Sequence, residues 1–402
     1  MSAPAPLALG APPPIPQAAR DRVTARLASG RLHRYREGGG ASGAVAELEA
    51  AFAELIGTRY AVATNSCGSA LYLAMLGAGV QPGMPVLMSA FTLAPVIGAI
   101  VNAGARPVAI EITSDLVLDL DDLADKAAAT GARHLLVSHM RGHVCDLERL
   151  ADHCDRLGLA LIEDCAHSLG ATWAGRPTGA FGLAGAFSFQ SWKHVNAGEG
   201  GILVTSDDDL AARAILHSGS YMLYRQNGTC PPDAVMARWR DRCANFSLRL
   251  SEIAAEIALP QIDELPARAA DWNASHDRIA AGLASVHGVA LAHRPEAEGY
   301  VQSSLQFRLP GLAAPQMAAF VAACRDGGLF LKWFGMAEAE GYTSAPRHWS
   351  DLPGAPGAPR TQAILDTLCD FRLPLGLAPA ACDRIVAIIA AALGQATARR
   401  TA

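Results

Sequence analysis

Two neighbouring stretches decide the fold: LALIEDCAHSLGA at residues 159–171 and GAFSFQSWKHVNAGEGGILVT at residues 185–205. The first has the short apolar run of a buried strand and ends in the acidic pair Glu163-Asp164. The second has two such runs, joined by a glycine-rich turn that contains Lys193. Because an open α/β sheet presents its ligand-binding groups at the carboxyl ends of parallel strands, we expect Asp164 and Lys193 to lie at one edge of a sheet.

Outward from these stretches, short apolar runs alternate with amphipathic segments. Strands and helices in alternation predict a mostly parallel sheet with helices on both faces. The expected strands are Tyr60–Thr64, Val86–Ser89, Pro107–Glu111, His134–Ser138, Ala160–Glu163, Gly185–Gln190 and Gly201–Thr205. The expected helices are Val45–Ile56, Ala70–Leu76, Ala94–Ala103, Leu120–Ala129, Asp146–Leu157 and Asp208–His217.

The pattern loosens beyond residue 220. Residues 221–244, rich in Arg, Pro and Asn, are expected to form a loop. A long helical stretch from Leu250 to about Leu283, interrupted by prolines, then leads into a smaller α+β region. There we expect strands at Ser304–Leu309 and Leu329–Trp333 and a closing helix at Cys382–Leu393.

These patterns predict three parts: an N-terminal arm (1–44), a large α/β domain (45–262) and a small C-terminal α+β domain (263–402). The arm is either mobile or docked. The ends before Pro16 and after Gly394 are compositionally simple and are expected to fray.

Composition excludes several classes of protein. The chain has 402 residues and a formal net charge of −5, so it offers no basic surface for nucleic acid. The longest apolar run, 385–393, is about half of the roughly 20 residues that a membrane span needs. The nine cysteines contain no CxxC pair, and the histidines at 139, 143 and 153 have no metal-ligand spacing. We therefore expect a soluble cytoplasmic protein without a metal, and neither nucleic acid nor membrane as a partner.

Lysine is rare enough to be informative, since only Lys126, Lys193 and Lys332 occur. An ε-amine can form a Schiff base, whereas an arginine cannot. Lys126 follows Asp122 by four residues, which favours an ordinary ion pair on a helix surface. Lys332 can either pair with an acid or line a cleft, and Lys193 is either solvated in its loop or held at a site.

The segment TNSCGSALYLA, residues 64–74, places a turn of small residues between a strand and a helix. Backbone N–H groups at such a helix N-terminus can bind an anion, although the same residues also serve as ordinary helix caps. Asp164 has two interpretations as well. It either caps the segment that follows it or lies beneath a pyridine nitrogen and keeps that nitrogen protonated.

Taken together, these segments resemble fold-type-I pyridoxal phosphate enzymes, and more closely the DegT/StrS family of sugar aminotransferases. The resemblance covers residues 29–393, and five motifs carry it: SCxxAL at 66–71, IEDCAHSLGA at 162–171, SFxxxK at 188–193, GEGG at 198–201 and RLSEIAAEIALPQI at 249–262. It implies a mostly parallel, seven-stranded type of sheet with helices on both faces and a smaller C-terminal α+β domain. It also implies pyridoxal 5′-phosphate as the cofactor.

The resemblance assigns roles to individual residues. Lys193 would form the Schiff base and carry the proton, Asp164 would pair with the pyridine nitrogen, and His167 would contact the ring or its phenolic oxygen. The residues expected to hold the phosphate are Gly68, Ser69 and Ser188. In the family an Asn reaches the phosphate from the neighbouring subunit; here the matching text is ANFSLRLSE, in which either Asn245 or Ser247 can serve. A homodimer with shared active sites is therefore expected.

Two departures bear on the substrate. The family has an aromatic residue that stacks on the cofactor, whereas FTLAP places Leu93 there, so that aliphatic packing, or Phe91 after a loop shift, would replace it. The family's HLYG is HMRG in this chain, which puts Arg141 in place of Tyr. Arginine binds carboxylate or phosphate, so Arg141 and Lys332 are candidate substrate residues.

The resulting hypothesis is an aminotransferase that moves an amino group from an amino acid to a keto acceptor such as a ketosugar or a cyclitol ketone. Glutamate or glutamine is the donor that the resemblance implies. A lyase or a β/γ-replacement enzyme would use the same residues and is the alternative. A noncatalytic scaffold is a third possibility, against which the presence of Lys193 argues.

Overall fold

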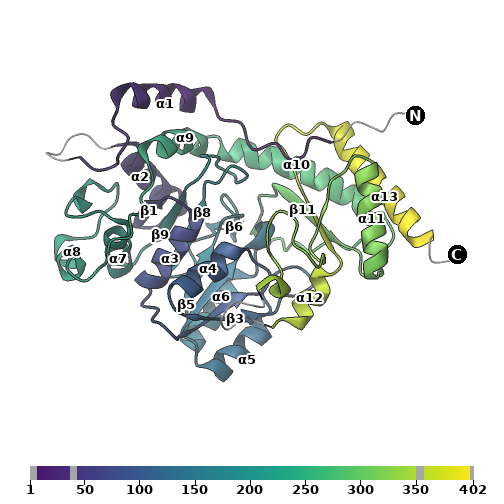
Figure 1. Cartoon of the computed structure of the whole chain (residues 1–402), viewed down its shortest axis with the longest axis horizontal. Helices are drawn as coiled ribbons and strands as arrows, with labels where there is room; N and C mark the ends of the chain where they lie inside the picture. The colour runs from purple at the N-terminus through teal and green to yellow at the C-terminus, as the bar shows by residue number, and fades with distance from the viewer. Residues whose placement is uncertain (1–6, 37–42, 350–356, 399–402) are drawn as a thin grey trace.

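The computed structural model describes residues 7–36, 43–349 and 357–398, and is shown in Figure 1. Its central sheet has seven strands: β1 (Tyr60–Thr64), β2 (Pro85–Ser89), β3 (Arg106–Ile110), β4 (His134–Ser138), β5 (Ala160–Asp164), β8 (Ala184–Ser188) and β9 (Gly201–Thr205). Their order is β1-β9-β8-β5-β4-β2-β3. Only β9 runs against its neighbours, so the expected mostly parallel sheet is confirmed.

Helices cover both faces of this sheet. They are α2 (Ala44–Ile56), α3 (Cys67–Gly77), α4 (Ala94–Asn102), α5 (Leu120–Thr130), α6 (Leu147–Leu157), α7 (Asp208–Ser218) and α9 (Glu252–Ile262). Successive strand residues face opposite sides: Leu136 packs in the cluster that holds α3, α4 and α7, whereas Leu135 packs with α5 and α6. The strands of this sheet are mostly apolar because both faces of the sheet are buried.

A second, smaller sheet lies in the C-terminal part of the chain. It consists of β11 (Ser304–Arg308), β13 (Leu368–Arg372) and β12 (Lys332–Trp333), which pair antiparallel in the order β11-β13-β12. The helices α10 (Leu265–Ala284), α11 (Ala314–Asp326) and α13 (Pro379–Ala398) pack with it and lie together at the right of Figure 1. The remaining short strands, β6 (Thr172–Trp173), β7 (Arg176–Pro177) and β10 (Glu298–Gly299), form a third sheet.

Some of the expectations for the region after residue 220 are wrong. The expected loop 221–244 contains the turn Tyr224–Gln226 and helix α8 (Asp233–Trp239), which is stabilised because its Met236 is fully buried against α7. The interrupted helical stretch expected from 250 to 283 is confirmed, and the interruption lies between Ile262 and Leu265, where α9 ends and α10 begins. The strand expected at 329–333 is only the two residues of β12.

Other elements were not anticipated. Helix α1 (Gln17–Ser29) packs along α9, and α11, α12 (Pro359–Leu365) and β13 were all absent from the expectations. Helix α13 continues through Ala398, so the fraying expected after Gly394 is wrong as far as residue 398. By length and composition, α13 is the one helix among the described residues that could cross a membrane; it packs against α10 and α11 as a core helix does.

The N-terminal segment is docked from residue 7 onward, which corrects the expected fraying before Pro16. In Figure 1 it runs between the smaller sheet's helices and α1. Leu9 is buried in the core of the C-terminal part, and the Leu7 N–H donates to the Gly328 carbonyl at 2.9 Å. The Asn196 side chain donates to the Pro13 carbonyl at 2.8 Å. The segment therefore connects the two larger sheets.

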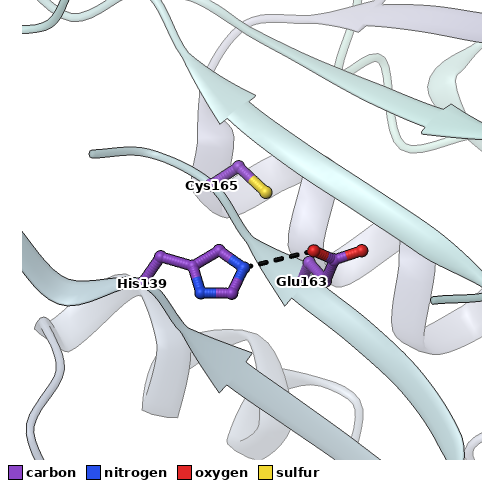
Figure 2. Close-up of side chains that lie close together, drawn as sticks. All are labelled: His139, Glu163 and Cys165. Carbon is purple, nitrogen blue, oxygen red and sulfur yellow. Dashed lines mark hydrogen bonds and ion pairs between the residues drawn. The ribbon is translucent and has the colours of Figure 1, made fainter. Parts of the chain in front are cut away.

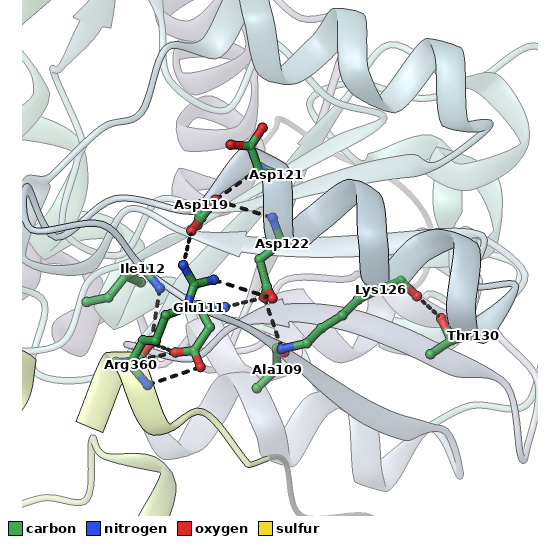
Figure 3. Close-up of polar contacts among 10 residues, drawn as sticks. Ala109, Glu111, Ile112, Asp119, Asp121, Asp122, Lys126, Thr130 and Arg360 are labelled. Atoms are coloured by element: carbon green, nitrogen blue, oxygen red, sulfur yellow. Dashed lines mark hydrogen bonds and ion pairs between the residues drawn. The ribbon is translucent and has the colours of Figure 1, made fainter. Parts of the chain in front are cut away.

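A polar network joins α12 to the large sheet (Figure 3). The buried Glu111 carboxylate follows β3 and accepts hydrogen bonds from the Thr361 N–H and hydroxyl, both at 2.6 Å, and from the Arg360 N–H at 3.2 Å. The Arg360 guanidinium pairs with Asp119 at 2.9 Å and Asp122 at 3.5 Å. Lys126 also pairs with Asp122, at 2.9 Å, as its spacing predicts.

Candidate active site

A cavity of about 310 Å³ lies where the carboxyl ends of β5 and β8 meet the N-terminus of α3. Cys67, Gly68, Asp164, Ser188 and Lys193 all line it. Segments more than 100 residues apart in the sequence meet here because parallel strands end at the same edge of a sheet. This arrangement brings the two stretches that decide the fold to one site.

Lys193 lies in the turn between β8 and β9. Its Nζ is 2.6 Å from Nε2 of His167. Burial, reinforced by the positive charge of Arg141, lowers the pKa of Lys193 to about 7. Burial and the neighbouring Lys193 also lower the pKa of His167 well below its usual range, so that its imidazole is neutral. A lysine amine that is partly unprotonated near neutral pH can attack a carbonyl carbon.

Asp164 is the last residue of β5 and points toward the same cavity. One carboxylate oxygen accepts a hydrogen bond from the Ser138 hydroxyl at 2.9 Å, and the other accepts the Ala166 N–H at 3.1 Å. Ser138 in turn lies 2.5 Å from the Thr92 hydroxyl. Both expected roles of Asp164 are therefore compatible with its geometry, since it caps the following turn and still borders the cavity. Ser138 and Thr92 were not identified from the sequence, because a single serine or threonine forms no recognisable sequence motif.

The N-terminus of α3 forms an anion-binding end of the cavity. Ser66 caps the helix by accepting the Ser69 N–H at 3.0 Å, so the N–H groups of Cys67 and Gly68 have no partner inside the helix. Ser188 approaches from β8 and also lines the cavity. Ser69 does not line it, because its hydroxyl donates to Asn65 at 2.6 Å.

Gly201, the last glycine of the GEGG motif and the first residue of β9, lies too close to the start of α3 to carry a side chain. A Cβ at this position would lie 2.4 Å from the Cys67 nitrogen and 2.5 Å from the Ser66 carbonyl carbon. Only glycine therefore lets β9 pass directly behind the N-terminus of α3. The open N–H groups, the two serines and this close backbone form a cradle of the size and chemistry that a phosphate requires.

The substrate candidates lie in different places. Arg141 lines the cavity and pairs with Asp370 at 2.6 Å, and Leu93 also lines it. Lys332 does not; it lines an adjoining cavity, where its Nζ donates to the carbonyls of Glu340 and Tyr342 at 2.6 and 2.9 Å. Burial lowers the pKa of Lys332 to about 8.

Phe91 cannot replace the missing aromatic residue. It is buried and packs edge-on against Phe334, with ring centroids 5.2 Å apart. Leu93 is therefore the residue at this wall of the cavity. Tyr342 and Arg372 of the C-terminal part line the cavity too. From the sequence, Arg372 could bind a substrate carboxylate, although a surface or ion-pair role is favoured for it.

Asn245 and Ser247 lie outside the cavity of their own chain. Both are exposed, and Ser247 has a left-handed backbone with φ of 55°. The neighbouring Leu248 carbonyl accepts the Asn65 N–H at 2.9 Å, which holds this turn beside the start of α3.

A second polar cluster, formed by His139, Glu163 and Cys165, lies beneath the site (Figure 2). Their ligand-type atoms lie within 4.8 Å of one another, as in some metal sites. The Glu163 carboxylate already accepts His139 Nε2 at 3.2 Å and the N–H groups of Gly179, Phe181 and Gly182 at 2.8 to 2.9 Å. Burial raises the pKa of Cys165 well above its usual range, which keeps the thiol protonated. Through these contacts the cluster stabilises the turn at residues 179–182.

The fold and this site define a class: an α/β enzyme fold of type I, with a lysine and an acid at the edge of its sheet. The profile of the DegT/DnrJ/EryC1/StrS aminotransferase family matches residues 18–334. The chain belongs to this family.

Individual proteins are similar to this chain over shorter or longer stretches. GDP-perosamine synthase of Caulobacter vibrioides is 31% identical over 222 residues, which are 55% of this chain and 57% of that protein. Spore coat polysaccharide biosynthesis protein SpsC of Bacillus subtilis is 36% identical over 190 residues, 47% of each chain. These matches span about half the length of the two curated relatives. The crystal structure of DesI in the presence of its TDP-sugar product matches 99% of this chain and 96% of its own, at 26% identity and a TM-score of 0.79.

Proposed function

We propose that this protein is a pyridoxal-phosphate-dependent aminotransferase that moves an amino group from an amino acid donor to a keto acceptor. One observation carries the proposal: the ε-amine of Lys193, with its pKa of about 7, lies in the same cavity as Asp164 and the open N-terminus of α3. A Schiff-base lysine, an acid for a ring nitrogen and a phosphate cradle are what this cofactor needs from a protein.

The residues fit the cofactor one by one. The N–H groups of Cys67 and Gly68 and the hydroxyls of Ser66 and Ser188 would bind the phosphate. Asp164, oriented by Ser138, would hold a proton on the ring nitrogen, and Leu93 would pack against the ring. Ser69 would act through Ser66, whose hydroxyl it contacts at 2.9 Å.

When bound, pyridoxal phosphate supplies an aldehyde that condenses with amines and a ring that withdraws electrons from the adjacent carbon. Lys193 would take the proton from the α-carbon of the donor and return a proton at the cofactor's C4′ atom. A pKa near 7 suits both directions of this transfer. The neutral His167 would accept a hydrogen bond from the ammonium form of Lys193 and hold that side chain over the site.

The acceptor class that we propose is a keto sugar, a cyclitol ketone or a related biosynthetic ketone. Its support is the family itself and the relatives whose names refer to perosamine, to polysaccharide biosynthesis and to a TDP-sugar product. A lyase or β/γ-replacement reaction remains the second candidate, because Leu93 and Arg141, the two departures from the family pattern, both line the cavity.

We also propose a homodimer in which each subunit completes the phosphate site of the other. Asn245 and Ser247 are exposed, and three large apolar side chains of the same region, Tyr221, Met222 and Phe246, are exposed with them. Such a surface favours a protein partner. Mixing the Lys193→Ala variant with an Asn245→Ala/Ser247→Ala variant should restore activity if the sites are shared, and should restore none if each subunit works alone.

The main test is the absorbance of the purified protein before and after L-glutamate, beside the Lys193→Ala variant. We expect a visible band of lysine-bound cofactor that disappears with the donor and is missing from the variant. A keto acceptor should restore it. A band that no donor changes, together with release of a β- or γ-substituent, would favour the lyase or replacement reaction. No band after reconstitution would contradict both.

A further inference from the structure

A second cavity, of about 370 Å³, adjoins the active-site cavity. The two share Arg141, Tyr342 and Arg372 as a common wall. The second cavity lies under the docked N-terminal segment, and its further lining residues are Leu7, Leu9, Gly10, Phe330 and Phe371, together with the charged Lys332 and Asp370. Two arginines therefore lie between the reacting end of the site and a neighbouring cavity that is largely apolar.

Arg372 has a positive charge without a carboxylate partner among the described residues. Within the described part of the chain, its only side-chain hydrogen bond joins Nη1 to the Trp192 carbonyl at 3.1 Å. Burial and the charge of Arg141 lower the pKa of Arg372, which means that its charged form is poorly compensated. A guanidinium remains charged at working pH nevertheless, so it attracts an anion.

Arg141 is held in place at a cost in backbone energy. Its φ of 58° is left-handed, a conformation that non-glycine residues rarely adopt, and its side chain is buried. The hydrogen bonds that it donates to Asp370 and to the Tyr342 hydroxyl both use Nη2. Its Nε is buried with no hydrogen-bond partner among the described residues. Nη2 of this guanidinium is thus paired, whereas Nε has no acceptor in that part of the chain.

We propose that Arg141 and Arg372 together bind a carboxylate group of the keto acceptor, so that the acceptor is an acidic ketone with an apolar portion. This inference rests on the proposed aminotransferase function and names the substrate class of the same site. The carboxylate would supply the acceptor that Arg372 lacks and would lie beside the guanidinium of Arg141, in the two-oxygen geometry that guanidinium groups match. It would also balance the charge of Arg372.

A carboxylate at this wall can come from the donor or from the acceptor. Beyond the arginines lies the second cavity, which Leu9 and Phe330 line, and a small amino acid with its amine at Lys193 has no group to place there. The acceptor therefore fits the second cavity better. The donor remains the competing source, and the experiment distinguishes the two.

The test uses the protein loaded with pyridoxamine phosphate and two matched probes that have no keto group and therefore cannot react, cyclohexane-1-carboxylate and its carboxamide. Calorimetry gives the dissociation constant of each for the wild type, Arg372→Gln and Arg372→Lys. The control is Arg308→Gln, since Arg308 lies at the opposite end of the same small sheet and lines neither cavity. We expect the wild type and the control to prefer the carboxylate by about 10- to 100-fold. Arg372→Gln should lose most of this preference, and Arg372→Lys should retain part of it.

The donor is tested separately through the rate at which L-glutamate bleaches the visible band. Arg372→Gln should raise the dissociation constant of the carboxylate probe by a factor at least ten times larger than the factor by which it slows the donor reaction. The proposal would be overturned if the wild type bound the two probes with equal affinity. It would also be overturned if Arg372→Gln slowed the donor reaction by the same factor by which it weakens binding of the carboxylate probe. Because probe binding is measured without turnover, its result is separate from a failure of glutamate to react, which would contradict the aminotransferase function instead.

Discussion

Nζ of Lys193 lies 2.6 Å from Nε2 of His167, so the amine is held against a neutral imidazole in the cavity that Asp164 also lines. Burial and the positive charge of Arg141 favour the neutral amine over the ammonium ion. The cavity thus prepares the lysine for attack on an aldehyde before any cofactor binds.

The first prediction concerns pH. Because the pKa of Lys193 is lowered to about 7, the neutral amine should accumulate as pH rises through 7 and be complete well below the usual lysine range. The rate at which the cofactor-free protein binds pyridoxal phosphate should rise to a plateau over the same interval. Stopped-flow absorbance at constant ionic strength measures it. A rate that continues to climb toward pH 10 would show that Lys193 titrates as an ordinary lysine.

The second prediction concerns the acid at the end of β5. Asp164→Asn should lower the rate of the donor reaction by about 100-fold or more, because an amide cannot hold a proton on the ring nitrogen as a carboxylate does. Ser138→Ala should have a smaller effect, since it removes only the hydrogen bond that orients Asp164. Single-turnover absorbance with L-glutamate measures both. Equal rates in Asp164→Asn and the wild type would assign Asp164 to capping alone.

The third prediction concerns the glycine behind the cradle. In Gly201→Ala the new methyl group would meet the Cys67 nitrogen at 2.4 Å, so β9 or α3 must shift, at about 1–3 kcal/mol of stability. The affinity of the Gly201→Ala variant for pyridoxal phosphate should fall together with its stability. The control is Gly98→Ala in α4, where a Cβ meets nothing within 4 Å and alanine favours the helix. Thermal unfolding and cofactor titration of both variants are the measurements.

The fourth prediction concerns the junction between the two larger sheets. Glu111→Gln replaces one acceptor oxygen by an amide that cannot accept, which leaves buried donors of Arg360 or Thr361 unpaired. We expect a loss of about 1–3 kcal/mol in the free energy of unfolding, measured in urea. Asp121→Asn on the exposed side of α5 should change it by less than about 0.5 kcal/mol. Similar losses in both variants would indicate that the Glu111 contacts contribute nothing specific.

Local patterns predicted the large sheet well, because each of its strands is an apolar run between turn residues. The site residues next to those strands, Asp164, Ser188 and Lys193, were placed correctly at the cavity for the same reason. Ser69 was not, since a serine at a helix start can either face a ligand or bond to Asn65, and spacing does not distinguish the two.

What the sequence left unpredicted depends on contacts between distant segments. The sequence left open whether Arg372 binds a substrate carboxylate or has an ordinary surface or ion-pair role, since only the pairing of β13 with β11 brings it beside Arg141. Helix α8 has too little amphipathic pattern in seven residues to be recognised, and it is stabilised by the burial of Met236 against another helix. The docking of residues 7–14 likewise depends on surfaces that form only after both sheets exist.

The docking of residues 7–14 has a consequence for the folding of the chain during its synthesis on the ribosome. The Pro14 carbonyl accepts a hydrogen bond from Arg268, 254 residues further along the chain, and Leu9 is buried among residues beyond 270. A ribosome therefore makes this segment long before its binding surface exists, and contacts of such sequence separation form slowly. Leu7 and Leu9 are therefore exposed to solvent during most of translation. A chaperone that binds short apolar peptides could bind this segment during that time.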